Sequence, residues 1–135
     1  MADILSARQA GLLLPLSALP ARHGIGDMGE TAHALAAMLA QAGVRIWQIL
    51  PLNPLGFGNS PYQPYSSFAG DPIYLNLDAL GVSAPAFREG EPRVDYAAVR
   101  AFKEPYLREA FRRFQPDEAY AVFVDQKWVR EYALF

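Results

Sequence analysis

The stretch that decides the fold is Val44–Asp71, VRIWQILPLNPLGFGNSPYQPYSSFAGD. Its first seven residues, 44–50, are nearly continuously apolar and rich in β-branched side chains, which predicts a strand covered on both faces in a parallel sheet. Pro51 ends this strand, because proline has no backbone N–H to donate to a strand ladder. The loop that follows combines prolines and glycines with four aromatic residues, Phe57, Tyr62, Tyr65 and Phe68. A loop of this length in a compact domain is usually functional or disordered, and the aromatic rings favour a binding loop.

The residues before this stretch predict a βαβ unit. Gly11–Leu14 is a short apolar strand that ends at Pro15. A helix follows, for which Asp27 is the predicted N-cap and Glu30, three residues later, completes an acidic version of a capping box. Gly43 is suited to end that helix. Strand, helix and strand with such short connections form a βαβ unit.

Composition excludes several classes of protein. With 135 residues, 52% of them hydrophobic and 13% aromatic, the chain is globular and corresponds to one domain or part of one. A net charge of −2 gives no electrostatic reason to bind nucleic acid or an anionic membrane. The absence of cysteine excludes disulfides and thiolate metal sites and favours a reducing compartment, so we expect a cytoplasmic protein.

The apolar run GLLLPLSALPA at residues 11–21 has an alternative interpretation as the core of a signal peptide. Against it, Asp3 lies in the leader, Arg8 is the leader's only cation, and Pro15 interrupts the apolar run. A strand of the mature fold is the preferred interpretation. Nothing in the sequence approaches the run of about 18 apolar residues that a membrane span needs.

The second half of the chain is predicted to be helical. The polar, proline-containing stretch 81–92 is the predicted boundary. Asp95 is the predicted cap of the next helix, in which Pro105 either causes a kink or opens a second helix. A last helix is predicted from about Asp117, and its apolar stripe continues to Phe135 without a cap, which is typical of a cut end.

The residues alone reveal no catalytic group. His23 and His33 lack metal-ligand spacing, and GIGDMG at residues 24–29 has neither the P-loop lysine nor the GxGxxG spacing. The serines occur in no nucleophile-elbow pattern. No pair of carboxylates suggests a general acid and its partner, and Asp71 is interpreted as a turn residue before proline. We therefore predict no metal site and no cofactor.

The aromatic loop favours a sugar as ligand. Ligands of parallel α/β folds bind at the carboxyl ends of the strands, where this loop begins. A tyrosine held by a preceding proline presents a flat apolar ring with a hydroxyl at its edge, which suits a pyranose. Tyr62, between Pro61 and Gln63, is the favoured ligand contact. Phe68 is predicted to pack the loop down, and Tyr65 fits both roles equally.

Long segments of the chain resemble the 4-α-glucanotransferases, also called amylomaltases or disproportionating enzymes. The resemblance is densest from Gly11 to Leu80 and is carried by RQAGLLLPLSALP (8–20), HGIGDMGE (23–30), AGVRIWQILPLNPLGFGNSPYQPYSSFAGDPIYLNLDAL (42–80) and KWVREYALF (127–135). It implies an α/β fold, the N-terminal part of a (β/α)8 TIM barrel with an inserted helical subdomain. Residues 1–82 are then the first βα elements with the substrate-binding loop 51–72, and residues 83–135 are the helical subdomain.

The resemblance also implies an activity. Members of this family cut an α-1,4-glucan, hold the glycosyl part covalently on an aspartate and pass it to the 4-hydroxyl of an acceptor sugar. This retaining chemistry needs two nearby carboxyl groups. In the family they come from later barrel strands, beyond Phe135, so no catalytic residue is assigned here. The implied substrate-binding residues are Tyr62 beneath the transferred sugar, Ser60 as a polar contact nearby, and Phe57 at an outer glucan site. The implied partners are the glucan and the remainder of the barrel.

Two other functions remain open from the sequence. If 135 residues are the natural length, the chain is a non-catalytic glycan-binding or partner module. PLNP (51–54) and PYQP (61–64) are also compatible with proline-rich ligands for an aromatic groove, although no flanking basic residue supports that function.

Overall fold

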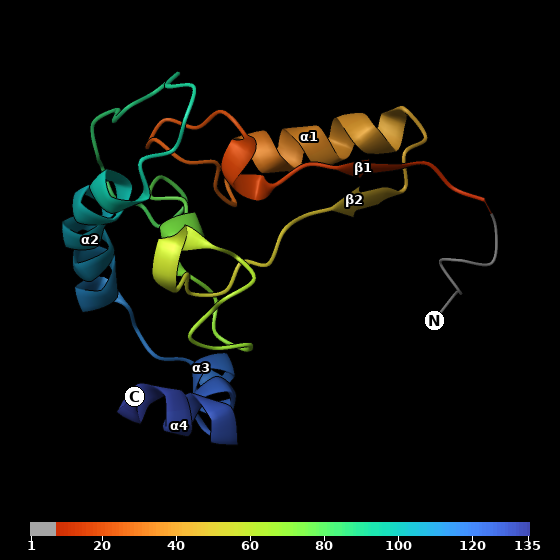
Figure 1. The fold of residues 1–135 in the computed structure, drawn as a ribbon. Helices are drawn as coiled ribbons and strands as arrows, with labels where there is room; N and C mark the ends of the chain where they lie inside the picture. Colours follow the sequence, from red (N-terminus) through yellow and green to blue (C-terminus); the bar gives the residue numbers. More distant parts are fainter. Residues whose placement is uncertain (1–7) are drawn as a thin grey trace.

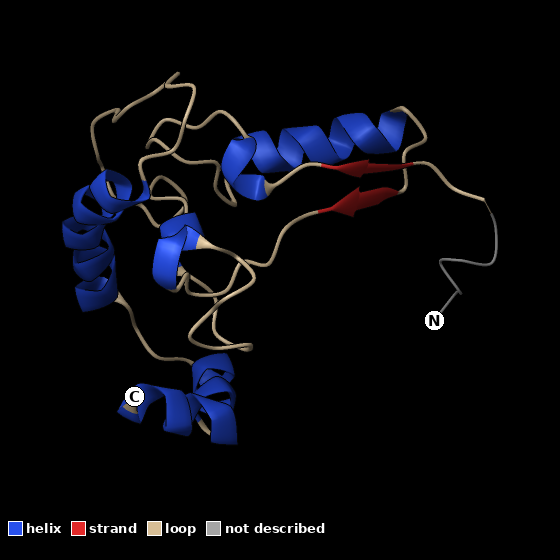
Figure 2. Cartoon of the chain, viewed as in Figure 1, coloured by secondary structure: helices blue, strands red, loops and turns tan. Residues whose placement is uncertain are grey.

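The computed structural model describes residues 8–135, and its sheet has two strands (Figures 1 and 2). β1 (Gly11–Leu13) pairs in parallel with β2 (Ile46–Gln48), with Gly11 opposite Ile46. α1 (Glu30–Gln41) connects the strands and runs back along the sheet (Figure 1). Gly43 follows the helix with a φ of 74°, a conformation that glycine adopts readily. The predicted βαβ unit is confirmed.

The strand after α1 is shorter and more exposed than predicted. Only 46–48 of the predicted 44–50 form β2. Of its three ladder residues, Ile46 and Trp47 are half-buried and Gln48 is exposed. Ile49, just beyond the strand, is 37% exposed. On the neighbouring strand Leu13 is 59% exposed. Burial on both faces requires covering layers on both sides of a sheet, and α1 is the only helix that runs along this two-stranded sheet (Figure 1) among residues 8–135.

The predicted capping box of α1 is wrong. Gly29, not Asp27, is the N-cap, and it makes no side-chain capping bond. Asp27 Oδ1 instead accepts from the N–H of Gly29 at 3.0 Å and from Asn76 Nδ2 at 2.9 Å. A Cβ at position 29 would lie 2.3 Å from Asn76 Nδ2, so the contact with a distant segment explains why glycine precedes this helix.

The second half contains three helices. α2 (Tyr96–Arg113) is capped by Asp95, as predicted, and continues through Pro105 as one helix. α3 (Glu118–Val124) is capped by Asp117, also as predicted, but it ends at Asp125. α4 (Lys127–Leu134) follows after this break, where the apolar stripe had predicted one continuous helix.

The hydrophobic core lies beyond the carboxyl ends of the strands. It joins the short 3-10 helices η1 (Leu16–Ala18) and η3 (Pro72–Tyr74) to the start of α2. Its buried members are Leu16, Leu19, Ile25, Ala32, Ile73, Tyr74 and Val99. The apolar run at residues 11–21, for which a signal peptide was the alternative interpretation, thus supplies β1 and part of this core. The division into residues 1–82 and 83–135 stays a prediction, and α2 contributes Val99 to the same core as η1.

No helix among residues 8–135 is long and apolar enough to cross a membrane.

Candidate functional site

The base of the loop 51–72 is closed by hydrogen bonds between its two ends. The N–H of Asp71 donates to the carbonyl of Leu52 at 2.8 Å, and Asn53 Nδ2 donates to the carbonyl of Ala69 at 3.0 Å. Each pair joins residues that are more than fifteen positions apart in the sequence. The loop therefore leaves the end of β2 and returns to the same place, ready to enter η3.

The tip of the loop is a tight hairpin. Leu55 and Pro64 form an antiparallel bridge, and the N–H of Tyr65 donates to the carbonyl of Pro54 at 3.1 Å. A Cβ at Gly56 would lie 2.2 Å from the carbonyl oxygen of Gln63, so the two arms approach too closely for any other residue there.

The predicted site residues lie together on this tip. Phe57 begins the short 3-10 helix η2 (Phe57–Asn59), in which Gly58 has a φ of 71°. Ser60 follows directly, and its Oγ accepts from the N–H of Tyr62 at 3.3 Å. This bond holds the Ser60 hydroxyl in the turn that presents the Tyr62 ring.

The four rings of the loop project into solvent. Phe57 is 91% exposed, Tyr62 71%, Tyr65 64% and Phe68 72%. Such large apolar exposure costs hydration free energy unless something covers it, and clustered exposed rings mark binding surfaces. The frame beneath them is held by backbone hydrogen bonds, so the rings occupy a prearranged surface.

The prediction that Phe68 packs the loop down is wrong. Its ring lies outside and stacks on Trp128 of α4, with ring centroids 5.8 Å apart. Leu55 and Ala69, with 7% and 6% exposure, anchor the loop instead. Ser66 explains the orientation of Phe68. The Ser66 Oγ accepts from the N–H groups of Phe68 and Ala69 and fixes the turn formed by residues 66–69.

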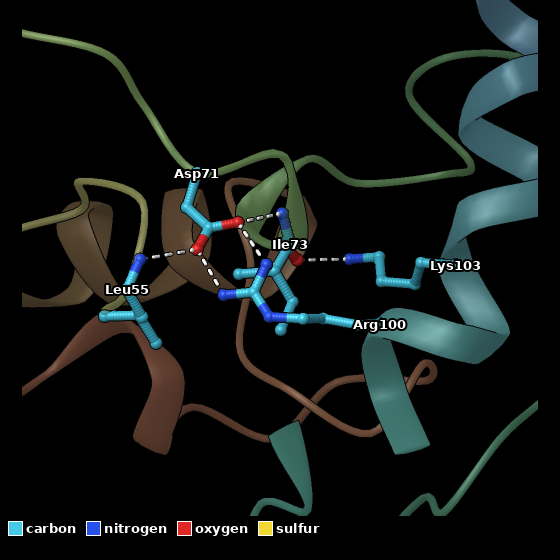
Figure 3. Close-up of polar contacts among 5 residues, drawn as sticks. All are labelled: Leu55, Asp71, Ile73, Arg100 and Lys103. Atoms are coloured by element: carbon cyan, nitrogen blue, oxygen red, sulfur yellow. Dashed lines mark hydrogen bonds and ion pairs between the residues drawn. The ribbon is translucent and has the colours of Figure 1, made fainter. Parts of the chain in front are cut away.

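Asp71, predicted only as a turn residue before proline, makes more hydrogen bonds than the predicted site residues. It is a fully buried carboxylate that accepts four of them (Figure 3). It accepts from the N–H groups of Leu55 at 3.2 Å and Ile73 at 3.0 Å. Arg100 of α2 donates to both of its oxygens, at 2.9 and 2.5 Å. One carboxylate thus joins the loop, η3 and α2.

Lys103 makes a second connection from α2. Its Nζ, with the side chain 1% exposed, donates to the carbonyl of Ile73 at 2.7 Å and lies 3.8 Å from Asp27 Oδ2. Burial lowers the pKa of Lys103 despite the Asp27 charge. The spacing in the sequence could have indicated this residue, because Lys103 lies on the same helix face as Tyr96 and Val99. A lysine on a face that packs inward needs a polar partner.

The pKa of Asp71 gives an expected pH dependence. Burial alone would raise that pKa, but the Arg100 hydrogen bonds and the Ile73 N–H outweigh burial and hold it below the ordinary 3.8. Asp71 therefore stabilises the fold above pH 3.8, and this contribution is lost as the pH falls further, through the lowered pKa of the folded state. In urea unfolding at a series of pH values, the stability difference between wild type and Asp71→Asn should shrink below that pH. A difference that does not change with pH would contradict this role.

The site has the features of a binding surface. The described residues 8–135 contain no group of three or more His, Cys, Asp or Glu side chains that could hold a metal ion. The two buried acids of this region, Asp27 and Asp71, are both held in ion pairs with α2. His23 is buried against the ring of Phe102 at 6.0 Å. What the loop offers to a ligand is a set of exposed aromatic rings, two of them with hydroxyl groups, on a hydrogen-bonded frame.

Comparison with known proteins gives consistent results. A family model described as 4-alpha-glucanotransferase matches residues 14–135. The 4-alpha-glucanotransferase of Thermus thermophilus is 42% identical over 142 aligned positions, which cover 95% of this chain and 28% of that protein. The 4-alpha-glucanotransferase of Synechocystis is 39% identical over 98% of this chain and 29% of its own length.

A solved structure is similar as well. The amylomaltase from Streptococcus agalactiae in complex with acarbose superimposes with a TM-score of 0.76 and 31% identity, over 94% of this chain and 27% of that one. The α/β class and the likeness to part of an amylomaltase are therefore confirmed. This chain spans less than a third of the length of these relatives.

Proposed function

The chain belongs to the 4-alpha-glucanotransferase family, and we propose that it forms the part of such an enzyme that holds an α-1,4-glucan. The observation that carries this proposal is the hairpin tip of the loop 51–72, which presents exposed rings on a hydrogen-bonded frame. A glucan has apolar sugar faces that cover such rings and hydroxyl groups that remain hydrated or bind polar neighbours. The acarbose complex of the similar amylomaltase supports a sugar as ligand.

The proposed reaction is transfer of a glucan segment to the 4-hydroxyl of an acceptor sugar with retention. Such transfer requires a carboxylate nucleophile and a carboxylic acid about 5–5.5 Å apart. Asp27 and Asp71 form ion pairs with cationic side chains of α2. Neither carboxylate is therefore suited to act as the nucleophile or the acid of this reaction. We propose that residues outside this chain supply both groups, and that the helices of 83–135 form an inserted subdomain of the complete barrel.

Within this proposal, three residues of the tip contact the glucan. Tyr62 stacks beneath the sugar that is transferred, Ser60 makes a polar contact nearby, and Phe57 lies at an outer glucan site. The sugar ring flattens as it approaches its oxocarbenium-like transition state. A flat aromatic surface fits the flattened ring better than the chair, so this contact lowers the barrier to transfer in addition to binding the substrate.

Tyr62→Ala is the direct test. Loss of the ring removes the apolar surface that covers one sugar face, and it should raise the Kd of acarbose for this chain at least about tenfold, or 1.4 kcal/mol. Tyr62→Phe keeps the ring and should be milder. Isothermal titration calorimetry on wild type and both variants measures the effect.

Tyr132→Ala is the matched control, because Tyr132 is an exposed tyrosine of α4 and should leave the Kd unchanged. If Tyr62→Ala lowers the melting temperature but binds acarbose as tightly as wild type, Tyr62 has a structural role only. If wild type does not bind acarbose at all, the proposed glucan surface is refuted for this chain.

A further inference from the structure

Asp71 holds both ends of the aromatic loop through one side chain. Its Oδ2 accepts from the N–H of Leu55, the last residue before the hairpin tip, and its Oδ1 accepts from the N–H of Ile73 in η3. The two N–H groups belong to buried residues 18 positions apart in the sequence. Without this carboxylate, the loop would keep the bonds of Leu52 and Asn53 at its base, the buried side chains of Leu55 and Ala69, and the stacking of Phe68 on α4, but no hydrogen bond would join Leu55 to η3 and α2.

Arg100 determines where Asp71 itself lies. Its guanidinium donates to both carboxylate oxygens of Asp71, so the ion pair is bidentate (Figure 3). A bidentate pair fixes both the position of the carboxylate and the orientation of its plane. Arg100 extends from α2, a helix of 18 residues, and Lys103 one turn later holds the carbonyl of Ile73. The loop is therefore oriented relative to α2 through two cationic side chains.

Apart from the buried Leu55 side chain and the stacking of Phe68 on Trp128, the aromatic tip has little else that fixes its direction. The rings of Phe57, Tyr62 and Tyr65 are mostly exposed and do not pack into the core. The bridge between Leu55 and Pro64 and the bond from Tyr65 to Pro54 shape the tip internally. Neither of them connects the tip to another part of the molecule.

We infer that Asp71 and Arg100 are positioning residues for the glucan surface: their bidentate pair fixes the direction in which the aromatic tip faces the sugar. The inference rests on the proposed function for its ligand, and on the contacts of Asp71 for its mechanism. A prearranged surface binds more tightly than a mobile one, because less conformational entropy is lost on binding. Asp71 is fully buried and Arg100 binds it, so in this inference each acts through Leu55 and the tip.

Arg100→Met tests this inference, because methionine keeps an apolar stem and removes both donors. The first measurement is hydrogen–deuterium exchange of the amides of 56–68, which should become about tenfold faster as the tip loses its anchor. The second is calorimetric titration with acarbose, whose Kd should rise about tenfold as the tip loses its prearranged orientation. Exchange in α1 should remain as in wild type, which distinguishes a local release of the tip from general destabilisation.

Two further variants complete the experiment. Arg108→Met removes an arginine of the same helix that pairs with Glu104 at an exposed position, and it should change neither measurement. Arg100→Lys keeps the charge but cannot bind both oxygens in the same plane, so it should give an intermediate loss and decides the outcome if Arg100→Met does not fold.

The outcomes separate this inference from the proposed function. Unchanged exchange at the tip in Arg100→Lys and Arg100→Met overturns the positioning role, whatever the sugar does. Faster exchange with an unchanged Kd also overturns it, since the tip then does not need orientation to bind. If wild type fails to bind acarbose, the proposed function fails, while the exchange measurement still decides whether Arg100 orients the tip.

Discussion

Replacing Asp71 by alanine is expected to lower the free energy of unfolding by about 3–5 kcal/mol, the range for breaking a buried ion pair. The substitution leaves the buried N–H groups of Leu55 and Ile73 without acceptors, and each such donor costs about 1–3 kcal/mol. Arg100 is 40% exposed and can turn towards water when its partner is removed. The unpaired guanidinium therefore accounts for the smaller part of the lost stability. Urea unfolding followed by circular dichroism measures the change.

Asp78→Ala is the matched control for this prediction. Asp78 also pairs with an arginine, Arg22, at 3.6 Å, but both side chains are about half exposed. Exposed pairs contribute about 0.2–1 kcal/mol, so the control should remain close to wild type. Equal losses in the two variants would show that the buried hydrogen bonds of Asp71 do not stabilise the fold.

Gly26→Ala is expected to cost about 3 kcal/mol or more, at the upper end of overpacking effects. A Cβ at this position would lie 1.9 Å from the carbonyl oxygen of Leu16 and 2.8 Å from the N–H nitrogen of Leu19. Both atoms belong to the backbone around η1, and the N–H of Gly26 itself donates to the carbonyl of Ser17 at 3.2 Å. The backbone must move to admit a methyl group, and this movement disturbs the core.

Gly70→Ala provides the comparison, since a Cβ at Gly70 would meet no atom within 4 Å. We expect this variant to change the free energy of unfolding by no more than about 0.5 kcal/mol. Thermal unfolding of both alanine variants and wild type gives the measurement. A melting temperature of Gly26→Ala equal to that of Gly70→Ala would contradict the close approach of η1 to Gly26.

The sequence predicted the elements whose signals are local. The apolar run before Pro51 located β2, and Asp95 and Asp117 located the starts of α2 and α3, because strand patterns and caps depend on neighbouring residues. The aromatic loop was recognised for the same reason. Its rings lie within a dozen residues of one another between prolines and glycines.

The errors concern residues whose partners are distant in the sequence. Asp71 and Arg100 are 29 positions apart, and no spacing rule connects a turn aspartate to an arginine on a later helix. Asp27 looked like an N-cap because a cap needs only a local acceptor, whereas its actual partner Asn76 comes from a segment 49 residues away. The break between α3 and α4 at Asp125 lacks the glycine or proline that usually marks one.

The stacking of Phe68 on Trp128 gives the chain an optical probe of its own. The sequence holds two tryptophans, and the indole N–H of the other, Trp47, donates to the carbonyl of Leu14 beside the sheet. The fluorescence of Trp47 therefore depends on its surroundings beside the sheet. The fluorescence of Trp128 depends on whether the aromatic loop lies against α4. With excitation selective for tryptophan, movement of the loop changes the surroundings of Trp128 and not those of Trp47, so tryptophan emission reports that movement without any attached dye.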